Sequence, residues 1–209
     1  MRSWFGKRGP QITPEWIVLG LGNPGAEYAH TRHNIGFDVI DILASRHRIR
    51  LNLHRDHARY GLGKIADIPV LLAKPMTYMN RSGEAARALL QRYPLETARL
   101  LVIVDDVALP TGRIRIRPSG SDGGHNGLAS LIQCVGTQAF PRVRVGIGNP
   151  PPGQMVEYVL SRFLPQEQPI IEEALQRAAD AVEVTIAEGV QAAMNRFNAQ
   201  NTAQTPGKG

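Results

Sequence analysis

Two short, uninterrupted apolar runs, at residues 16–19 and 100–104, constrain the fold of this chain more than any other feature. Neither run is long enough for a typical helix, and neither alternates apolar with polar residues as a strand with one solvated face would. Runs of this kind are typical of strands that are covered on both faces, as in a parallel sheet between helices. The chain is therefore expected to be an α/β protein.

Strands and helices alternate along the rest of the sequence. Further strands are predicted at residues 59–65, 69–73, 113–117 and 143–147, with a turn at 66–69. Helical spacing of apolar residues predicts helices over 35–47, 82–92, 126–135 and 166–188, with a short helix after Gly189. The pattern predicts one α/β domain over residues 15–198, with a mixed, twisted β-sheet sandwiched between helices. Residues 1–14 are expected to be a flexible extension and residues 199–209 a disordered tail.

A glycine-rich loop follows the first apolar run, and its G-x-G-x-x-G spacing at residues 20–25 is that of a dinucleotide-binding loop. Such a loop has to run directly into a helix whose N–H groups face a pyrophosphate. Here Pro24 lacks an N–H, and the helical pattern begins only at residue 35. The expected acidic residue would be Asp41, which falls inside that helix. A tight turn at the carboxyl end of a strand is the better interpretation, and open α/β sheets bind ligands at that edge.

Polar residues gather in the loops that reach this edge. His33 directly precedes a predicted helix, where the helix dipole favours the neutral imidazole that a general base needs. Asp105 and Asp106 follow the strand at 100–104, and a carboxylate there could fix the tautomer of a histidine. Three loops offer amides that can hold a carbonyl group and a water, on Asn23, Asn80 and Asn126. The alternative is that His33 only caps or packs, and that the acids cap or are solvated.

The sequence offers little support for other kinds of site. It contains no G-x-S-x-G motif, and the pairs His30/His33 and His54/His57 lack a nearby third ligand, so no metal site is predicted. The single cysteine, Cys134, excludes an internal disulfide and indicates a reducing compartment. Because it lies in an apolar helical stretch, we expect a buried core thiol. No membrane-spanning segment and no secretory signal is expected.

Basic residues suggest a polyanionic partner. The formal net charge of +6 favours nucleic acid, although a basic surface kept for solubility is the alternative. Strand alternation over residues 113–117 puts Arg113, Arg115 and Arg117 on one face, and Arg142 and Arg144 repeat the pattern. Like charges on one face repel each other unless an anion lies across them, and arginine binds phosphate bidentately. A phosphodiester chain is therefore a natural ligand, with a solvated strand face as the alternative.

Taken in order, five blocks of the sequence resemble bacterial-type peptidyl-tRNA hydrolases. They read GLGNPGAEY at 20–28, TRHN at 31–34, KP with TYMN over 74–80, GGHNG at 123–127 and RVRVGIG at 142–148. The resemblance covers residues 16–197. It implies a monomeric, cytoplasmic α/β enzyme of phosphorylase/hydrolase-like fold, without cofactor, metal or membrane contact. The family cleaves the ester between a peptide and the 3′ ribose of tRNA, which recycles tRNA from aborted translation.

The resemblance also assigns roles residue by residue. It implies that His33 is the catalytic histidine and that Asp105 is its partner acid, because Ala108 stands where some relatives carry another acid. The family's substrate-positioning asparagines fall on Asn23, Asn80 and Asn126. Three further positions would line the crevice: Tyr28, Met79 and His125.

The same resemblance predicts which parts of tRNA are bound. The partner would be peptidyl-tRNA, held at its acceptor stem, 3′ CCA end and 5′-phosphate. The family's 5′-phosphate clamp matches Arg117 and Arg144. Many relatives carry lysines at positions 115 and 117, which keep the charge but differ in reach, so either Arg115 or Arg117 could contact the phosphate.

With no serine or cysteine nucleophile in evidence, water has to attack the ester. His33 would take its proton, Asp105 would hold the imidazole, and Asn126 is expected to contact the oxyanion. Two alternatives remain. Relatives in plant organelles serve as RNA-splicing cofactors, so a non-catalytic RNA-binding protein is one, although pure binding does not require a water-activating histidine. A dinucleotide-dependent enzyme is the other, and it predicts a shift in melting temperature with NAD.

Overall fold

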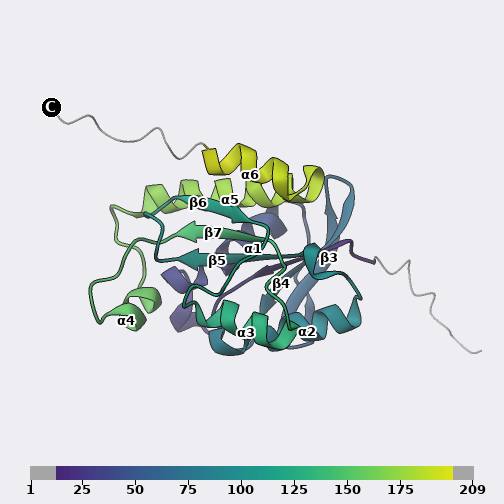
Figure 1. Ribbon diagram of the computed structural model, residues 1–209, viewed down its shortest axis with the longest axis horizontal. Coiled ribbons are helices and arrows are strands. Elements are labelled where there is room, and N and C mark those ends of the chain that lie inside the picture. Colours follow the sequence, from purple (N-terminus) through teal and green to yellow (C-terminus); the bar gives the residue numbers. More distant parts are fainter. Residues whose placement is uncertain (1–12, 200–209) are drawn as a thin grey trace, which may run out of the picture.

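A computed structural model describes residues 13–199 of the chain. Its centre is a seven-stranded sheet with the order β2-β3-β4-β1-β5-β7-β6 (Figure 1). The strands are β1 (Trp16–Gly20), β2 (Leu53–Arg55), β3 (Ala58–Ile65), β4 (Ile68–Pro75), β5 (Leu100–Asp106), β6 (Ile114–Arg117) and β7 (Arg142–Gly146). The neighbours β4, β1, β5 and β7 run parallel, whereas the other pairs are antiparallel. The predicted mixed sheet is thus confirmed, and the carboxyl ends of its parallel strands lie at one edge.

Helices cover both faces of the sheet (Figure 1). One face carries α1 (Ile35–Arg46), α5 (Gln168–Glu188) and α6 (Val190–Ala199), and the other carries α2 (Ser82–Arg92) and α3 (Asn126–Val135). Because helices cover both faces of the sheet, the first apolar run, which forms β1, has apolar side chains on both of its faces. Trp16 and Val18 belong to the core under α1 and α5, while Ile17 and Leu19 belong to the core under α2 and α3.

The glycine-rich loop serves the packing of α1 against β1. Two turns of 3₁₀ helix, Ala26–Tyr28 and Arg32–Asn34, follow β1 before α1 begins at Ile35. A Cβ at Gly20 would lie only 2.1 Å from the carbonyl oxygen of Gly36, so only glycine permits this close crossing. The loop does not run directly into a helix as a dinucleotide-binding loop does. The close crossing instead brings His33 to the edge of the sheet.

The predicted strands and helices all occur within two residues of their expected bounds. The turn between β3 and β4 is shorter than predicted. Only Ala66 and Asp67 lie between the two strands, with positive φ angles of 49° and 63°, and Pro69 lies within β4. One strand, β2, and one α-helix, α4 (Met155–Leu160), were not predicted, and neither were the short 3₁₀ turns. The prediction for Cys134 is wrong in part, since the thiol is half-buried rather than buried in the core.

The chain ends lie mostly outside the described residues. Of the predicted extension and tail, residues 1–14 and 199–209, the structure describes only Thr13, Pro14 and Ala199. Ala199 is the last residue of α6, so this helix reaches one residue into the predicted tail. Within residues 13–199, no helix combines the length and the apolar character that crossing a bilayer requires.

Candidate active site

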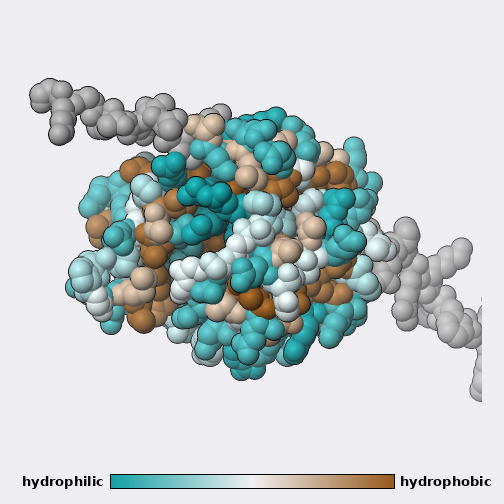
Figure 2. All heavy atoms as spheres, in the orientation of Figure 1, coloured by the Kyte–Doolittle hydropathy of each residue, from teal (hydrophilic) through white to brown (hydrophobic). Residues whose placement is uncertain are grey.

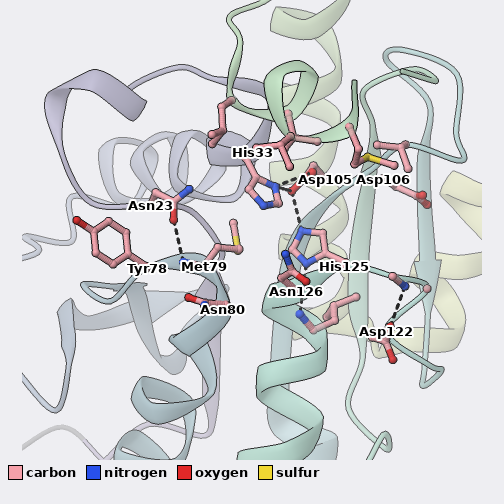
Figure 3. A pocket seen from close by; sticks show the side chains of 18 of the residues that line it. Asn23, His33, Tyr78, Met79, Asn80, Asp105, Asp106, Asp122, His125 and Asn126 are labelled. Atoms are coloured by element: carbon pink, nitrogen blue, oxygen red, sulfur yellow. Dashed lines mark hydrogen bonds and ion pairs between the residues drawn. The ribbon is translucent and has the colours of Figure 1, made fainter. Parts of the chain in front are cut away.

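The carboxyl ends of β1, β4 and β5 and the loops that follow them surround a cavity of about 520 Å³ (Figure 3). Open α/β sheets bind their ligands at this edge. Most of the residues predicted for the site line the cavity together, although they come from separate parts of the chain: Asn23, His33, Met79, Asn80, Asp105, His125, Asn126 and Arg144.

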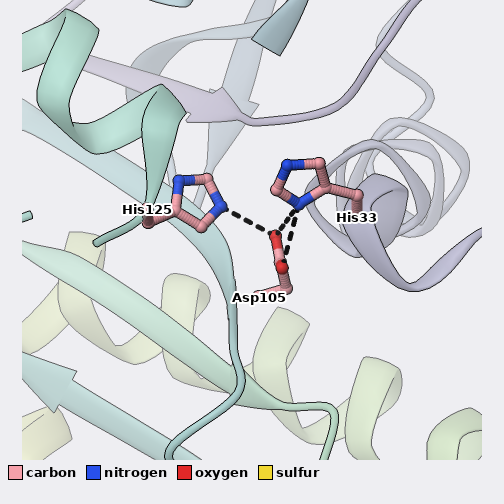
Figure 4. A group of neighbouring side chains, drawn as sticks. All are labelled: His33, Asp105 and His125. Carbon is pink, nitrogen blue, oxygen red and sulfur yellow. Dashed lines mark hydrogen bonds and ion pairs between the residues drawn. The ribbon is translucent and has the colours of Figure 1, made fainter. Parts of the chain in front are cut away.

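His33 and Asp105 form a buried hydrogen-bonded pair. The Nδ1 atom of His33 lies 3.0 Å from each carboxylate oxygen of Asp105, and the two side chains are 11% and 2% exposed. An ionised carboxylate only accepts hydrogen bonds, so Nδ1 carries the proton and donates it. The lone pair of His33 is then on Nε2, on the side of the ring away from Asp105 (Figure 4). Among the described residues, none bonds to Nε2, which leaves it free to accept a proton.

A second imidazole donates to the same carboxylate. The Nδ1 atom of His125 accepts hydrogen bonds from the N–H groups of Gly127 (3.1 Å) and Leu128 (3.3 Å) at the start of α3. Its proton is therefore on Nε2, which donates to Oδ1 of Asp105 at 2.9 Å (Figure 4). The fixed backbone of α3 thus sets the tautomer of His125, and His125 in turn helps to fix the orientation of Asp105.

The two imidazoles decide the charge of Asp105. Burial by itself would raise the pKa of this carboxyl group, because a charged carboxylate is costly to desolvate. Charge interactions and hydrogen bonds from His125 and His33 outweigh burial and hold the pKa of Asp105 well below its usual range. Asp105 is therefore ionised throughout the pH range in which histidines titrate, and it can stabilise an imidazolium on His33.

These three side chains also have the residue types of a metal site, with ligand atoms within 4.8 Å of one another. A metal needs a lone pair on each ligating nitrogen. The Nε2 atom of His125 carries a proton in this tautomer, and moving that proton to Nδ1 would point it at the N–H groups of Gly127 and Leu128. The cluster therefore fits a hydrogen-bonded pair of histidines around one carboxylate better than it fits a metal.

Asn23 presents an oriented amide to the cavity. Its backbone is held by the side chain of Asn34, which accepts from the Asn23 N–H and donates to the Asn23 carbonyl, both at 2.9 Å. Its Oδ1 accepts a hydrogen bond from the N–H of Met79 at 2.8 Å. Only the amide oxygen can accept this hydrogen bond, so the bond distinguishes Oδ1 from the NH₂ group. The NH₂ group is therefore the end that faces the cavity (Figure 3).

Asn80 and Asn126 offer amides of a different kind. Both are exposed and line the cavity, Asn80 from the 3₁₀ turn after β4 and Asn126 from the first position of α3 (Figure 3). Among the described residues, neither side-chain amide has a hydrogen-bond partner. These two side chains can therefore turn to suit a ligand, whereas the amide of Asn23 is fixed.

The predicted role of Tyr28 toward the substrate stays a prediction. Tyr28 is half-buried at the end of a 3₁₀ turn and is not among the residues that line this cavity. The tyrosine that does line the cavity is Tyr78, which is 60% exposed and was not predicted. Its place directly before the predicted Met79 and Asn80 was the available signal.

One wall of the cavity was not predicted from the sequence. Four apolar residues form it, all from α4: Met155, Val156, Val159 and Leu160. The spacing of four residues between Met155 and Val159, and between Val156 and Leu160, was the only sequence signal for this short helix.

The basic strands are arranged partly as predicted. On β6, Arg115 and Arg117 alternate with buried isoleucines, and Arg115 pairs in register with Arg144 of β7. Arg144 lines the cavity, and its Nη2 lies 2.7 Å from Oδ2 of Asp106. Arg115 and Arg117 do not border the cavity. Partial burial, together with the charges of Arg117, Arg144 and Arg113, lowers the pKa of Arg115, as expected for clustered like charges.

Arg142 departs from the predicted pattern. It is 2% exposed, and it donates to the backbone carbonyls of Ser121 (2.9 Å) and Gln138 (3.1 Å). Burial and the charge of Arg144 lower the pKa of Arg142 to about 10. Its guanidinium therefore ties together two loops instead of joining an anion-binding face.

Comparisons with known proteins agree on one family. A family model described as "Peptidyl-tRNA hydrolase" matches residues 17–205. Peptidyl-tRNA hydrolase of Chloroflexus aggregans is 52% identical over 88% of this chain and 98% of the relative, and that of Bacillus subtilis is 49% identical over 88% and 98%. A crystal structure of peptidyl-tRNA hydrolase from Acinetobacter baumannii has a TM-score of 0.84 at 36% identity, and the match covers 91% of this chain and 98% of that one.

Proposed function

The chain belongs to the peptidyl-tRNA hydrolase family, and we propose that it hydrolyses peptidyl-tRNA with a water molecule that His33 activates. One observation carries this proposal above all. The Nδ1–H group of His33 is engaged by Asp105, so that Nε2 is the ring nitrogen that faces a cavity of about 520 Å³. A neutral, oriented imidazole with a free nitrogen is what general-base catalysis requires.

The proposed reaction is a two-step ester hydrolysis. Water attacks the carbonyl carbon of the ester while Nε2 of His33 takes one of its protons, and a tetrahedral oxyanion forms. The intermediate then collapses, the bond from the carbonyl carbon to the 3′ oxygen of the ribose breaks, and His33 returns its proton to that oxygen. Asp105 stays ionised and stabilises the imidazolium between the two steps.

Preorganisation favours Asn23 as the contact for the oxyanion, in place of Asn126. Donors stabilise a developing charge best when they need no reorganisation as it forms. The NH₂ group of Asn23 is held in place by Met79 and Asn34, whereas Asn126 is exposed and has no partner among the described residues. We assign Asn126 and Asn80 to the substrate around the ester, where amides that can turn are useful.

The tRNA contacts are proposed on the basic strands. Arg144 would bind the 5′-phosphate, with Arg117 or Arg115 beside it, and the acceptor stem and 3′ CCA end would lead from there to the cavity. The register of Arg115 with Arg144 supports a shared site for one phosphate group. From the family resemblance, we also propose that the protein acts as a cytoplasmic monomer without a cofactor.

A non-catalytic RNA-binding role is the second candidate, and one assay separates the two. N-acyl-aminoacyl-tRNA is incubated with the protein, and free tRNA is measured. The wild-type protein should release tRNA, and His33→Ala should lower the rate by about 10²–10⁴ while it still binds deacylated tRNA. If the wild-type protein binds the substrate without cleaving it, the RNA-binding role is the correct one.

A further inference from the structure

Arg32, the residue before His33, is buried although it carries a full charge. Only 4% of its side chain is exposed. Its Nη2 donates to Oε2 of Glu167 at 2.6 Å, and its Nη1 donates to Oγ of Ser161 at 2.8 Å and to the carbonyl of Arg162. A buried guanidinium has to be paired and hydrogen-bonded in this way to offset its desolvation. All of these partners come from the segment that follows α4.

Aromatic rings and a backbone hydrogen bond also connect Arg32 to this segment. The Cζ atom of Arg32 lies 4.4 Å from the ring centroid of Tyr158 and 4.8 Å from that of Phe163. The N–H of Arg32 donates to the carbonyl of Ser161 at 2.9 Å. The turn that carries His33 is therefore joined through Arg32 to residues 158–167, a segment more than one hundred residues away in sequence.

The segment matters because α4 forms the apolar wall of the cavity. Met155, Val156 and Leu160 line the cavity and remain 48%, 63% and 36% exposed. Apolar residues gather at the left of Figure 2, where Figure 1 places α4. A helix of six residues is not stable by itself, so the position of this wall depends on its anchors. Arg32 connects the C-terminal end of α4 to the 3₁₀ turn that carries His33.

We propose that Arg32 is a positioning residue, which fixes the apolar wall of α4 relative to His33 so that a bound peptide presents its ester to the imidazole. The inference rests on the proposed function. Arg32 does not border the cavity, and it acts through Tyr158, Ser161 and Glu167. A small misplacement of a substrate can cost up to about a hundredfold in rate, so the position of this wall should affect turnover.

The test compares Arg32→Lys with the control variant Arg46→Lys. Lysine keeps the charge but cannot form the same fork of hydrogen bonds or stack in the same way. Arg46 is a suitable control, because it bridges α1 and α5 through Asp180, Glu183 and Gln176, away from the cavity. Each protein is assayed with a tRNA that carries one N-acetylated amino acid and with a tRNA that carries an N-acetylated apolar tripeptide.

Arg32→Lys should lose about tenfold or more in kcat/KM with the tripeptide substrate, and clearly less with the single amino acid. The pH dependence should keep its shape, since His33 and Asp105 are unchanged. Arg46→Lys should match the wild type with both substrates. Equal losses of Arg32→Lys on both substrates, or no loss on either, would overturn the inference.

Hydrogen exchange gives a readout that needs no substrate. Arg32→Lys should speed the exchange of amides in residues 155–164 and leave those of α3 unchanged. If the variant fails to fold, Glu167→Gln removes the ion pair alone and should show the same pattern more weakly. Unchanged exchange in residues 155–164 contradicts the proposed link, even if the wild-type protein hydrolyses peptidyl-tRNA. Failure of the wild type to hydrolyse either substrate would count against the proposed function, and with it against a catalytic consequence of the link.

Discussion

A general base at His33 requires a ring of fixed orientation and a free ring nitrogen. Asp105 fixes the ring through Nδ1 and leaves Nε2 free. Asp105 stays ionised over the histidine range, because the charges and hydrogen bonds of His125 and His33 hold its pKa well below its usual range. A general base has to be unprotonated, so we expect kcat/KM to rise with pH between about pH 5 and 8. The measurement is single-turnover hydrolysis over that range, and a flat profile with chemistry rate-limiting would exclude His33 as the base.

A second prediction concerns the amide of Asn23. In Asn23→Asp the oxygen that accepts from Met79 remains, but the NH₂ donor is lost and a negative charge enters the cavity near Asp105. We expect kcat to fall by about 10²–10³, as when one oxyanion donor is removed, with little change in melting temperature. Asn195→Asp is the control, because it makes the same change on the exposed face of α6. Normal cleavage by Asn23→Asp would mean that Asn23 only shapes the turn.

Among the elements, α6 protects the exposed edge of the sheet. Strand β6 is an edge strand, and its Ile116 exchanges two hydrogen bonds with the side chain of Asn198, at 2.8 Å from the N–H and 3.0 Å to the carbonyl. Asn198→Ala leaves these buried backbone groups unsatisfied and should lower the free energy of unfolding by about 1–3 kcal/mol. Urea denaturation measures this change. A loss no greater than that of the exposed control, Asn195→Ala, would show that the edge gains nothing from Asn198.

The longer elements were predictable because their signals are local. Helix α3 and strand β5 follow directly from apolar spacing and from an unbroken apolar run. Helix α4 was missed because six residues show too little periodicity to be recognised. Its position depends on contacts with Arg32, a residue that is distant from α4 in the sequence. Fixed tertiary contacts of this kind leave no local pattern.

The same distinction holds within the site. His33, Asp105 and the three asparagines could be predicted because each lies at or near the end of a recognisable strand or helix. The tautomer of His125 could not, since it depends on the N–H groups of Gly127 and Leu128. Strand alternation correctly separated the two faces of β6, but it could not show that the loops around Ser121 and Gln138 enclose Arg142.

For the whole molecule, the proposed site has two ends. The ester would lie in the cavity beside His33, and the phosphate would lie on the basic strands β6 and β7. In tRNA the 3′ end and the 5′-phosphate belong to the same acceptor stem, so an enzyme that binds both can distinguish peptidyl-tRNA from a short acylated fragment. The formal net charge of +6 would draw any nucleic acid toward the protein, so only the phosphate contact supplies this selectivity.

We predict that Arg144→Ala raises KM for 5′-phosphorylated substrate and leaves kcat nearly unchanged. A charge-assisted hydrogen bond contributes about 1.5–3 kcal/mol, which corresponds to a change of about tenfold to a hundredfold in KM. The pairing of Arg144 with Asp106 holds the guanidinium at the cavity rim, so its loss removes a preoriented donor. Steady-state kinetics with substrates that carry or lack the 5′-phosphate form a double-mutant cycle, whose coupling isolates the contact. Arg46→Ala is the control, because Arg46 is likewise paired with acids but lies between α1 and α5. Equal losses by Arg144→Ala on both substrates would place Arg144 in general attraction to the tRNA backbone or in the fold, and the selectivity would then need another source.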